Sequence, residues 1–127
     1  MEKIIPFVLA MLLLAGCGAP AEEPSYRQIS MDEAVSMMES ESAYIILDVR
    51  TVEEYNERHV PGAINVPNEA IGSDAIPELP DKDQLILVYC RSGNRSKQAS
   101  EKLAALGYTN IVEFGGINDW PGETVSG

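Results

Sequence analysis

The chain is poor in cysteine, histidine and positive charge. Its 127 residues include two cysteines, one histidine, and nine lysines or arginines against twenty aspartates or glutamates, which gives a formal net charge of -11. Such a surface repels nucleic acids and anionic lipid headgroups, so charge argues against both as partners. Two cysteines and a single histidine, His59, also fall short of the ligand sets of common zinc sites. We therefore expect no metal site and no nucleic-acid interface.

A long apolar run is also lacking, because the longest, residues 4–14, is shorter than the roughly 20 residues that span a bilayer as a helix. This run follows Lys3, as in a secretion signal. It ends in Leu-Ala-Gly-Cys at residues 14–17, which resembles the lipobox of bacterial lipoproteins. We therefore expect residues 1–16 to form a lipoprotein signal peptide and Cys17 to be the lipidation site. The alternative is an uncleaved anchor.

The segment after Cys17 has the composition of a linker. Its sequence, GAPAEEPSY, is small, proline-bearing and acidic, and such a segment buries too little apolar area to fold. We expect an acylated tether over residues 17–25 and one folded domain over residues 26–127, about 100 residues being a common domain size. Whether residues 1–16 are a cleaved signal peptide or an uncleaved anchor, the domain should lie outside the cytosol. Acylation of Cys17 would attach it to a bacterial membrane.

The domain has the pattern of an α/β fold. Apolar runs rich in Ile, Val and Leu occupy residues 44–49, 63–66, 85–89 and 110–114. Continuous apolarity predicts strands buried on both faces, as in a parallel sheet between helices. Helical segments lie between the runs: Ser30 with Glu33 and Thr51 with Glu54 form capping-box patterns, and a third helix should run from near Ser96 to a stop at Gly107.

Cys90 is the candidate reactive residue. It has no partner for a disulfide in the chain if Cys17 is lipidated, and it directly follows the apolar run 85–89. Ligands bind at the carboxyl ends of strands in open α/β sheets. The next residues must turn into a helix, and their backbone N–H groups and the helix dipole would favour a thiolate. Arg91 and Arg95 add positive charge. An inert buried cysteine is the alternative.

Three motifs in order resemble those of single-domain rhodanese-like sulfurtransferases. CRSGNRS at residues 90–96 resembles their active-site loop, LDVRTVEEYNERHVPGAINVP at 47–67 their upstream signature, and GGINDWPG at 115–122 their closing segment. The resemblance covers nearly all of residues 27–122. It implies a rhodanese-like five-stranded parallel sheet flanked by helices on both faces, borne here on a lipoprotein. It also implies an enzyme without a cofactor that moves sulfane sulfur from an anionic donor such as thiosulfate to a thiol or cyanide.

The resemblance also assigns roles to residues. Cys90 would carry the persulfide as the catalytic residue, and Asp48 would support the site, more as a partner for backbone or an arginine than in acid–base chemistry. Arg50 would be scaffold, His59 part of a structural turn, and Trp120 a packing residue. The expected substrate-binding residues form the loop: Arg91, Ser92, Gly93, Asn94, Arg95 and Ser96.

Other functions remain open at this point. Phosphatases and arsenate reductases on the same fold use a Cys-x5-Arg loop, whereas this chain has Cys-x4-Arg from Cys90 to Arg95, one residue short for phosphate. A non-catalytic persulfide carrier or binding module, exchanging sulfur with a partner protein, has the same cysteine as a catalyst. The absence of a resolving cysteine argues against a thiol oxidoreductase.

Overall fold

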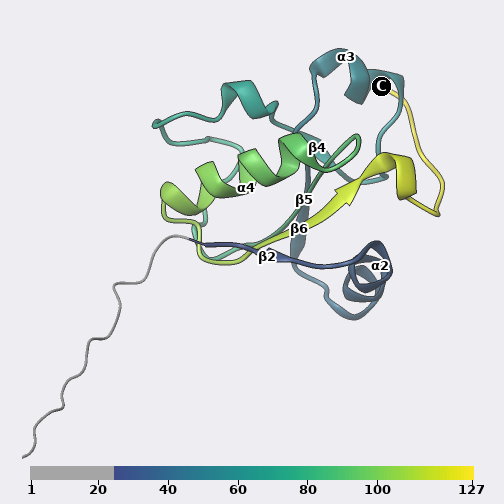
Figure 1. Cartoon of the computed structure of the whole chain (residues 1–127), viewed down its shortest axis with the longest axis horizontal. Coiled ribbons are helices and arrows are strands. Elements are labelled where there is room, and N and C mark those ends of the chain that lie inside the picture. The colour runs from purple at the N-terminus through teal and green to yellow at the C-terminus, as the bar shows by residue number, and fades with distance from the viewer. Residues whose placement is uncertain (1–24) are drawn as a thin grey trace, which may run out of the picture.

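Three apolar runs form the central strands of a parallel sheet in the computed structural model, which describes residues 25–127 (Figure 1). These strands are β3 (Tyr44–Asp48), β5 (Leu85–Cys90) and β6 (Ile111–Gly116). Two short strands complete the edges, β2 (Arg27–Gln28) beside β6 and β4 (Ile64–Asn65) beside β3. The order is β2-β6-β5-β3-β4 and every pairing is parallel. The predicted α/β class with a five-stranded parallel sheet is confirmed.

The helices begin at the predicted caps, with one shift. Helix α2 (Met31–Ser40) and helix α3 (Val52–Glu57) both have a complete capping box, from Ser30 with Glu33 and from Thr51 with Glu54. Helix α4 (Asn94–Ala105) begins two residues before the predicted start, because Gly93 in the left-handed conformation is its N-cap. Gly107, with φ +100°, follows its end as expected. Two 3-10 turns, η2 (Asn68–Ala70) and η3 (Ile117–Asp119), follow β4 and β6.

Helices cover both faces of the sheet. Successive strand residues point to opposite faces, so Val88 and Cys90 lie in one core cluster and Leu87 and Tyr89 in the other. The first cluster contains Leu103 of α4, whereas the second contains residues of α2 and α3. The side chain of Cys90 therefore belongs to the face that α4 covers, and α4 begins only four residues further along the chain.

The C-terminal segment lies beside α3 (Figure 1). His59 N donates to Val125 O at 2.8 Å, Val125 N donates back to His59 O at 2.9 Å, and Gly127 N donates to Asn56 O at 2.8 Å. These bonds hold the last residues against the end of the helix.

Some predictions concern residues outside this description. The signal peptide over residues 1–16, the lipidation of Cys17 and most of the tether lie outside the described residues. Within residues 25–127, no helix combines the length and the apolarity needed to cross a membrane.

Candidate functional site

The sulfur of Cys90 lies at the carboxyl end of β5, where the chain turns into α4. The residue is only 1% exposed. Gly93 N donates a hydrogen bond to Cys90 Sγ at 3.0 Å. Gly93 has φ +117°, which glycine adopts without the strain that a side chain would add. The turn therefore directs a backbone donor and the N-terminus of α4 toward the sulfur, an arrangement that suits negative charge on it.

The other loop residues do not share one role. Ser92 and Asn94 are exposed, and Asn94 is the first residue of α4. Ser96 is fully buried, and Cys90 Sγ lies 3.4 Å from its Oγ as a hydrogen-bond donor. Ser96 Oγ in turn contacts Gly93 O at 3.0 Å and donates to Oε2 of Glu113. Ser96 thus lies beneath the sulfur, whereas the sequence suggested a substrate contact.

Arg91 and Arg95 share one carboxylate. Arg95 donates to Glu54 through Nη1 at 2.8 Å and Nη2 at 3.2 Å, and Arg91 Nε donates to Glu54 at 3.2 Å. The hydrogen bond from Arg95 holds the pKa of Glu54 well below its usual range. The three side chains together carry a charge of +1 rather than the +2 that two free arginines would give. The charge on these loop side chains is therefore less positive than the loop sequence suggests.

Two acidic residues that contact the loop side chains were missed by sequence reasoning. Glu54 was recognised only as a capping residue, because nothing local to α3 indicates that it meets a loop about 40 positions away. Glu113 lies in the apolar run that became β6, and its one signal was an acidic residue among buried neighbours. It is 3% exposed and reaches the cysteine through Ser96.

Asp48 is a buried anchor of the strand ends. It is fully buried, and its carboxylate accepts from Arg50 Nη2 at 2.7 Å and from the Tyr89 hydroxyl at 2.6 Å. Burial raises the pKa of Tyr89, and the hydrogen bond to Asp48 raises it further. Arg50 also donates to Arg58 O at 2.7 Å. This network joins β3, β5 and the segment after α3. The interpretation of Asp48 and Arg50 as scaffold stays a prediction.

His59 and Trp120 also have structural surroundings. The His59 ring stacks on Tyr55 with centroids 3.8 Å apart, and its Nδ1 lies 2.8 Å from Tyr55 O. Trp120 Nε1 donates to Glu123 O at 2.9 Å. Both rings have local partners, as expected for a turn residue and a packing residue.

The loop rests closely on the end of β6. A Cβ added to Gly116 would overlap the carbonyl group of Arg91 and would lie 2.6 Å from Ser92 N. Asn118 N donates to Arg91 O at 3.2 Å. Only glycine at position 116 lets the backbone of the loop approach this closely, so the closing segment holds the loop in place.

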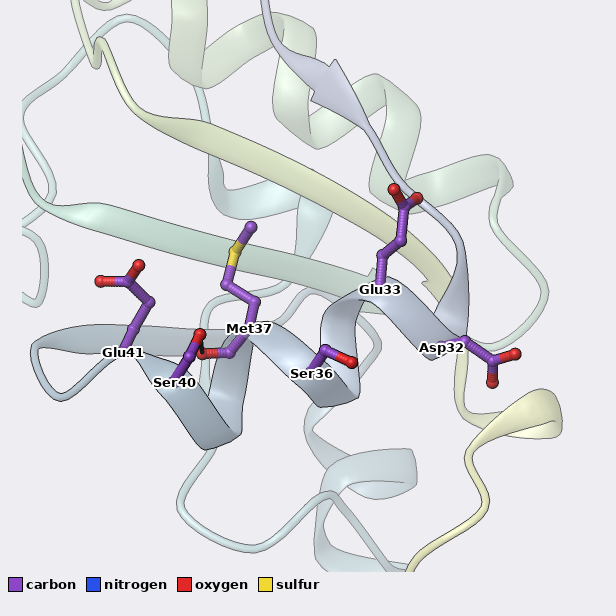
Figure 2. A pocket seen from close by; sticks show the side chains of 6 residues that line it. All are labelled: Asp32, Glu33, Ser36, Met37, Ser40 and Glu41. Atoms are coloured by element: carbon purple, nitrogen blue, oxygen red, sulfur yellow. Dashed lines mark hydrogen bonds between the residues drawn. The ribbon is translucent and has the colours of Figure 1, made fainter.

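Two pockets help to place the site. Figure 2 shows a pocket on α2 around Ser36 and Met37 that Asp32, Glu33 and Glu41 surround, and its acidity disfavours anionic ligands. A second pocket, of about 270 Å³, lies behind the loop and is lined by Ser92, Gly93, Lys97, Glu113 and Asp119 among others. Over residues 25–127 no three His, Cys, Asp or Glu side chains gather closely enough to hold a metal ion. The loop after β5 therefore remains the candidate site.

Glu54→Gln is expected to strengthen the binding of an anion such as thiosulfate, the donor that the family resemblance implies. Glutamine keeps the acceptor for Thr51 N but removes the charge that neutralises the arginines. The KM for thiosulfate should fall several-fold, as expected when a nearby opposing charge is removed.

Because the ionised form of Glu54 is the stabilised one, its contribution to stability is present at neutral pH. That contribution is lost as the pH falls below the ordinary value of 4.5 toward the lowered folded pKa.

The measurement combines steady-state kinetics with urea unfolding at neutral and acidic pH. The matched control is Glu53→Gln, which changes the exposed neighbour in the same helical turn. It should alter neither the KM for thiosulfate nor the stability against urea. A KM that is unchanged in Glu54→Gln, or lowered equally by Glu53→Gln, would contradict this electrostatic role.

Comparisons with known proteins agree with this geometry. A family model described as the rhodanese-like domain matches residues 30–123. The chain is 41% identical over 73 residues to thiosulfate sulfurtransferase PspE of Escherichia coli, covering 58% of this chain and 70% of that protein. It is 34% identical over 89 residues to the thiosulfate:glutathione sulfurtransferase of Saccharomyces cerevisiae, covering 60% of this chain and 63%, somewhat under two thirds, of the yeast protein.

A solved structure of a rhodanese with anions from E. coli superimposes with a TM-score of 0.61 at 39% identity, over 67% of this chain and all of that one. The family model alone spans most of the chain, and it includes β3, the loop after Cys90 and the closing segment. The chain therefore belongs to the rhodanese-like domain family.

Proposed function

We propose that the protein transfers sulfane sulfur from an anionic donor such as thiosulfate to a thiol or cyanide, through a persulfide on Cys90. The observation that carries the proposal is the position of Cys90 Sγ at the end of β5, with Gly93 N donating to it at 3.0 Å and α4 beginning beside it. A backbone donor and a helix N-terminus both stabilise negative charge. The names of the E. coli and yeast relatives support thiosulfate as donor and a thiol as acceptor.

The reaction needs an anionic sulfur twice. The Cys90 thiolate attacks the outer sulfur of thiosulfate, a new S–S bond forms, and the bond to the sulfonate sulfur breaks with sulfite leaving as the anion. Cys90 then carries a persulfide whose charge lies on the outer sulfur. An acceptor thiolate or cyanide attacks that outer sulfur, and the Cys90 thiolate leaves with the bonding pair. Because each sulfur leaving group is an anion, a site that stabilises negative charge favours both steps.

The direct test is mass spectrometry of the intact protein after incubation with thiosulfate. The protein should gain the mass of one sulfur atom, peptide mapping should locate it on Cys90, and cyanide should remove it with formation of thiocyanate. Failure to detect any adduct on Cys90 would refute the proposal.

A persulfide carrier would give a different pattern. It would accept the sulfur adduct from a partner protein but would not turn over free thiosulfate and cyanide. Phosphatase activity is disfavoured because the loop is one residue short and because Arg95, its last arginine, is already engaged by Glu54. Negligible hydrolysis of an aryl phosphate alongside repeated thiocyanate formation is the expected result.

We also propose that Cys17 is acylated and holds the domain at a bacterial membrane outside the cytosol. The lipobox-like residues 14–17 and the linker composition that follows support this location. Expressed in a bacterium, the full chain should fractionate with membranes and become labelled with a fatty-acid analogue, whereas Cys17→Ser should do neither. A Cys17→Ser protein that is still cleaved and membrane-bound would show that the lipobox assignment is wrong. Cys90→Ser serves as the control cysteine change, since it should leave the location unaltered.

A further inference from the structure

Glu113 is a buried acid within an otherwise apolar strand. It is 3% exposed, and its neighbours on β6 are buried hydrophobic residues. Oε2 accepts hydrogen bonds from Ser96 Oγ and, at 3.0 Å, from Gly115 N. Both partners are neutral. Among residues 25–127 no lysine or arginine forms an ion pair with Glu113. Burial of an unpaired carboxylate is costly, so this one invites a functional explanation.

Ser96 couples Glu113 to the cysteine. Its Oγ lies between Glu113 Oε2 and Cys90 Sγ, and the distance to the sulfur is 3.4 Å. A hydroxyl has one proton to donate. When Glu113 is ionised, its carboxylate is a stronger acceptor than the neutral Gly93 O, so we expect the proton to point to Glu113 and an oxygen lone pair to face the sulfur. A thiol can donate to this lone pair, whereas a thiolate is repelled by it.

We propose that Glu113, acting through Ser96, is a positioning residue that disfavours negative charge on Cys90 Sγ and thereby favours the persulfide over the free thiolate. This inference rests on the proposed persulfide chemistry. Ser96 occupies one side of the sulfur, so the second sulfur atom must bind on another side. In the persulfide the charge then lies one S–S bond, about 2 Å, further out. Glu113 therefore raises the free energy of the Cys90 thiolate more than that of the Cys90 persulfide. The persulfide is retained until an acceptor arrives.

Several other charges face these groups. Burial raises the pKa of Tyr26, and the charges of Glu101 and Glu113 raise it further. Tyr26, which precedes β2, is therefore a neighbour of Glu113. Lys97 and Asp119 line the pocket behind the loop together with Glu113. Glu54 pairs with the two arginines of the loop that follows Cys90. Of these charged side chains, only Glu113 accepts a hydrogen bond from Ser96. The charged and titratable neighbours are thus Tyr26, Glu54, Arg91, Arg95, Lys97, Glu101 and Asp119.

The test compares Glu113→Gln with Asp119→Asn, which removes a charge from the same pocket at an exposed residue. ¹³C NMR of the Cys90 Cβ follows the ionisation of the thiol, with its proton released to water, and needs no access for a reagent. In Glu113→Gln the carboxylate charge is lost, and the midpoint of the Cys90 titration should move to lower pH by about one unit. This is the size typical of the effect of a neighbouring like charge. The glutamine amide can also donate to Ser96 Oγ and turn its proton toward the sulfur. Asp119→Asn should leave the midpoint unchanged.

The second readout is the persulfide itself. At one fixed ratio of thiosulfate to sulfite, mass spectrometry should find the ratio of persulfide to free Cys90 several-fold lower in Glu113→Gln than in the parent. An unchanged midpoint in Glu113→Gln, or equal shifts in both variants, overturns the proposal. The proposal is also overturned if the adduct forms and the ratio of persulfide to free Cys90 is the same in Glu113→Gln as in the parent. A parent protein that never forms the adduct refutes the proposed function instead, and the titration still reports on Glu113.

A measurement on the unmutated protein covers the case in which Glu113→Gln does not fold. Coupling between two ionisable groups is reciprocal, so the Glu113 carboxyl carbon should shift over the pH range in which Cys90 ionises. This step should vanish in Cys90→Ala. A Glu113 carboxyl signal that does not change over the pH range in which Cys90 ionises would also overturn the proposal.

Discussion

Cys90→Ser is expected to abolish sulfur transfer and leave the fold almost intact. A hydroxyl cannot carry sulfane sulfur, and Cys90 is the only cysteine among residues 25–127. Serine is slightly smaller and can keep the contacts with Gly93 N and Ser96 Oγ. Thiocyanate formation from thiosulfate and cyanide should fall by roughly a thousandfold or more, as when a covalent nucleophile is lost. The sulfur adduct should disappear with it.

Ser36→Ala on α2, far along the chain from the loop, provides a control for the assay and for expression. Its turnover should match that of the parent. Thermal unfolding of both variants should occur near the parent temperature. Substantial turnover in Cys90→Ser would mean that another group carries the sulfur, and the proposed mechanism would have to be abandoned.

Gly116→Ala is expected to have the second largest effect, although it adds one methyl group. The new Cβ would overlap the carbonyl of Arg91, which is backbone and cannot rotate away as a side chain could. The loop would have to shift, and the hydrogen bond from Gly93 N to the sulfur would lose its geometry. Overpacking of this kind costs about 1–3 kcal/mol of stability. We expect sulfur transfer to fall by about a hundredfold, on the scale of a small misplacement at a reaction centre.

Gly72→Ala is the matched control, because a Cβ there meets open space and its φ lies outside the left-handed range. It should be neutral in both assays. Urea unfolding gives the stability change and thiocyanate formation gives the activity change. Equal activity of Gly116→Ala and Gly72→Ala would show that the closing segment does not hold the loop in its working position.

The main elements of the fold could be predicted because their signals are local. The apolar runs became strands β3 to β6, and the capping pairs at Ser30 and Thr51 began helices where expected. Strand β2 was missed because Arg27 and Gln28 are both exposed, so two polar residues gave no apolar signal. The early start of α4 was missed because the conformation of Gly93 depends on how the loop packs against β6.

The candidate site was predictable only in part, for the same reason. Cys90 and its loop form one continuous segment that ends a strand and begins a helix, so their proximity follows from the sequence. Glu54 and Glu113 come from α3 and β6, and their contacts with Arg95 and Ser96 depend on how distant segments pack. The neutralising partner of the two arginines and the acid that contacts Ser96 therefore became visible only in three dimensions.

The burial of Cys90 also limits which partners its thiol can meet. Cross-linking two copies of the chain through Cys90 would require their Cα atoms to approach within about 7 Å. Each Cys90 is 1% exposed, at a strand end covered by its own loop and by α4, so two copies cannot meet in this way without unfolding there. Small sulfur anions need far less room than a second protein. The fold can thus keep Cys90 from forming a disulfide with a second copy of the chain.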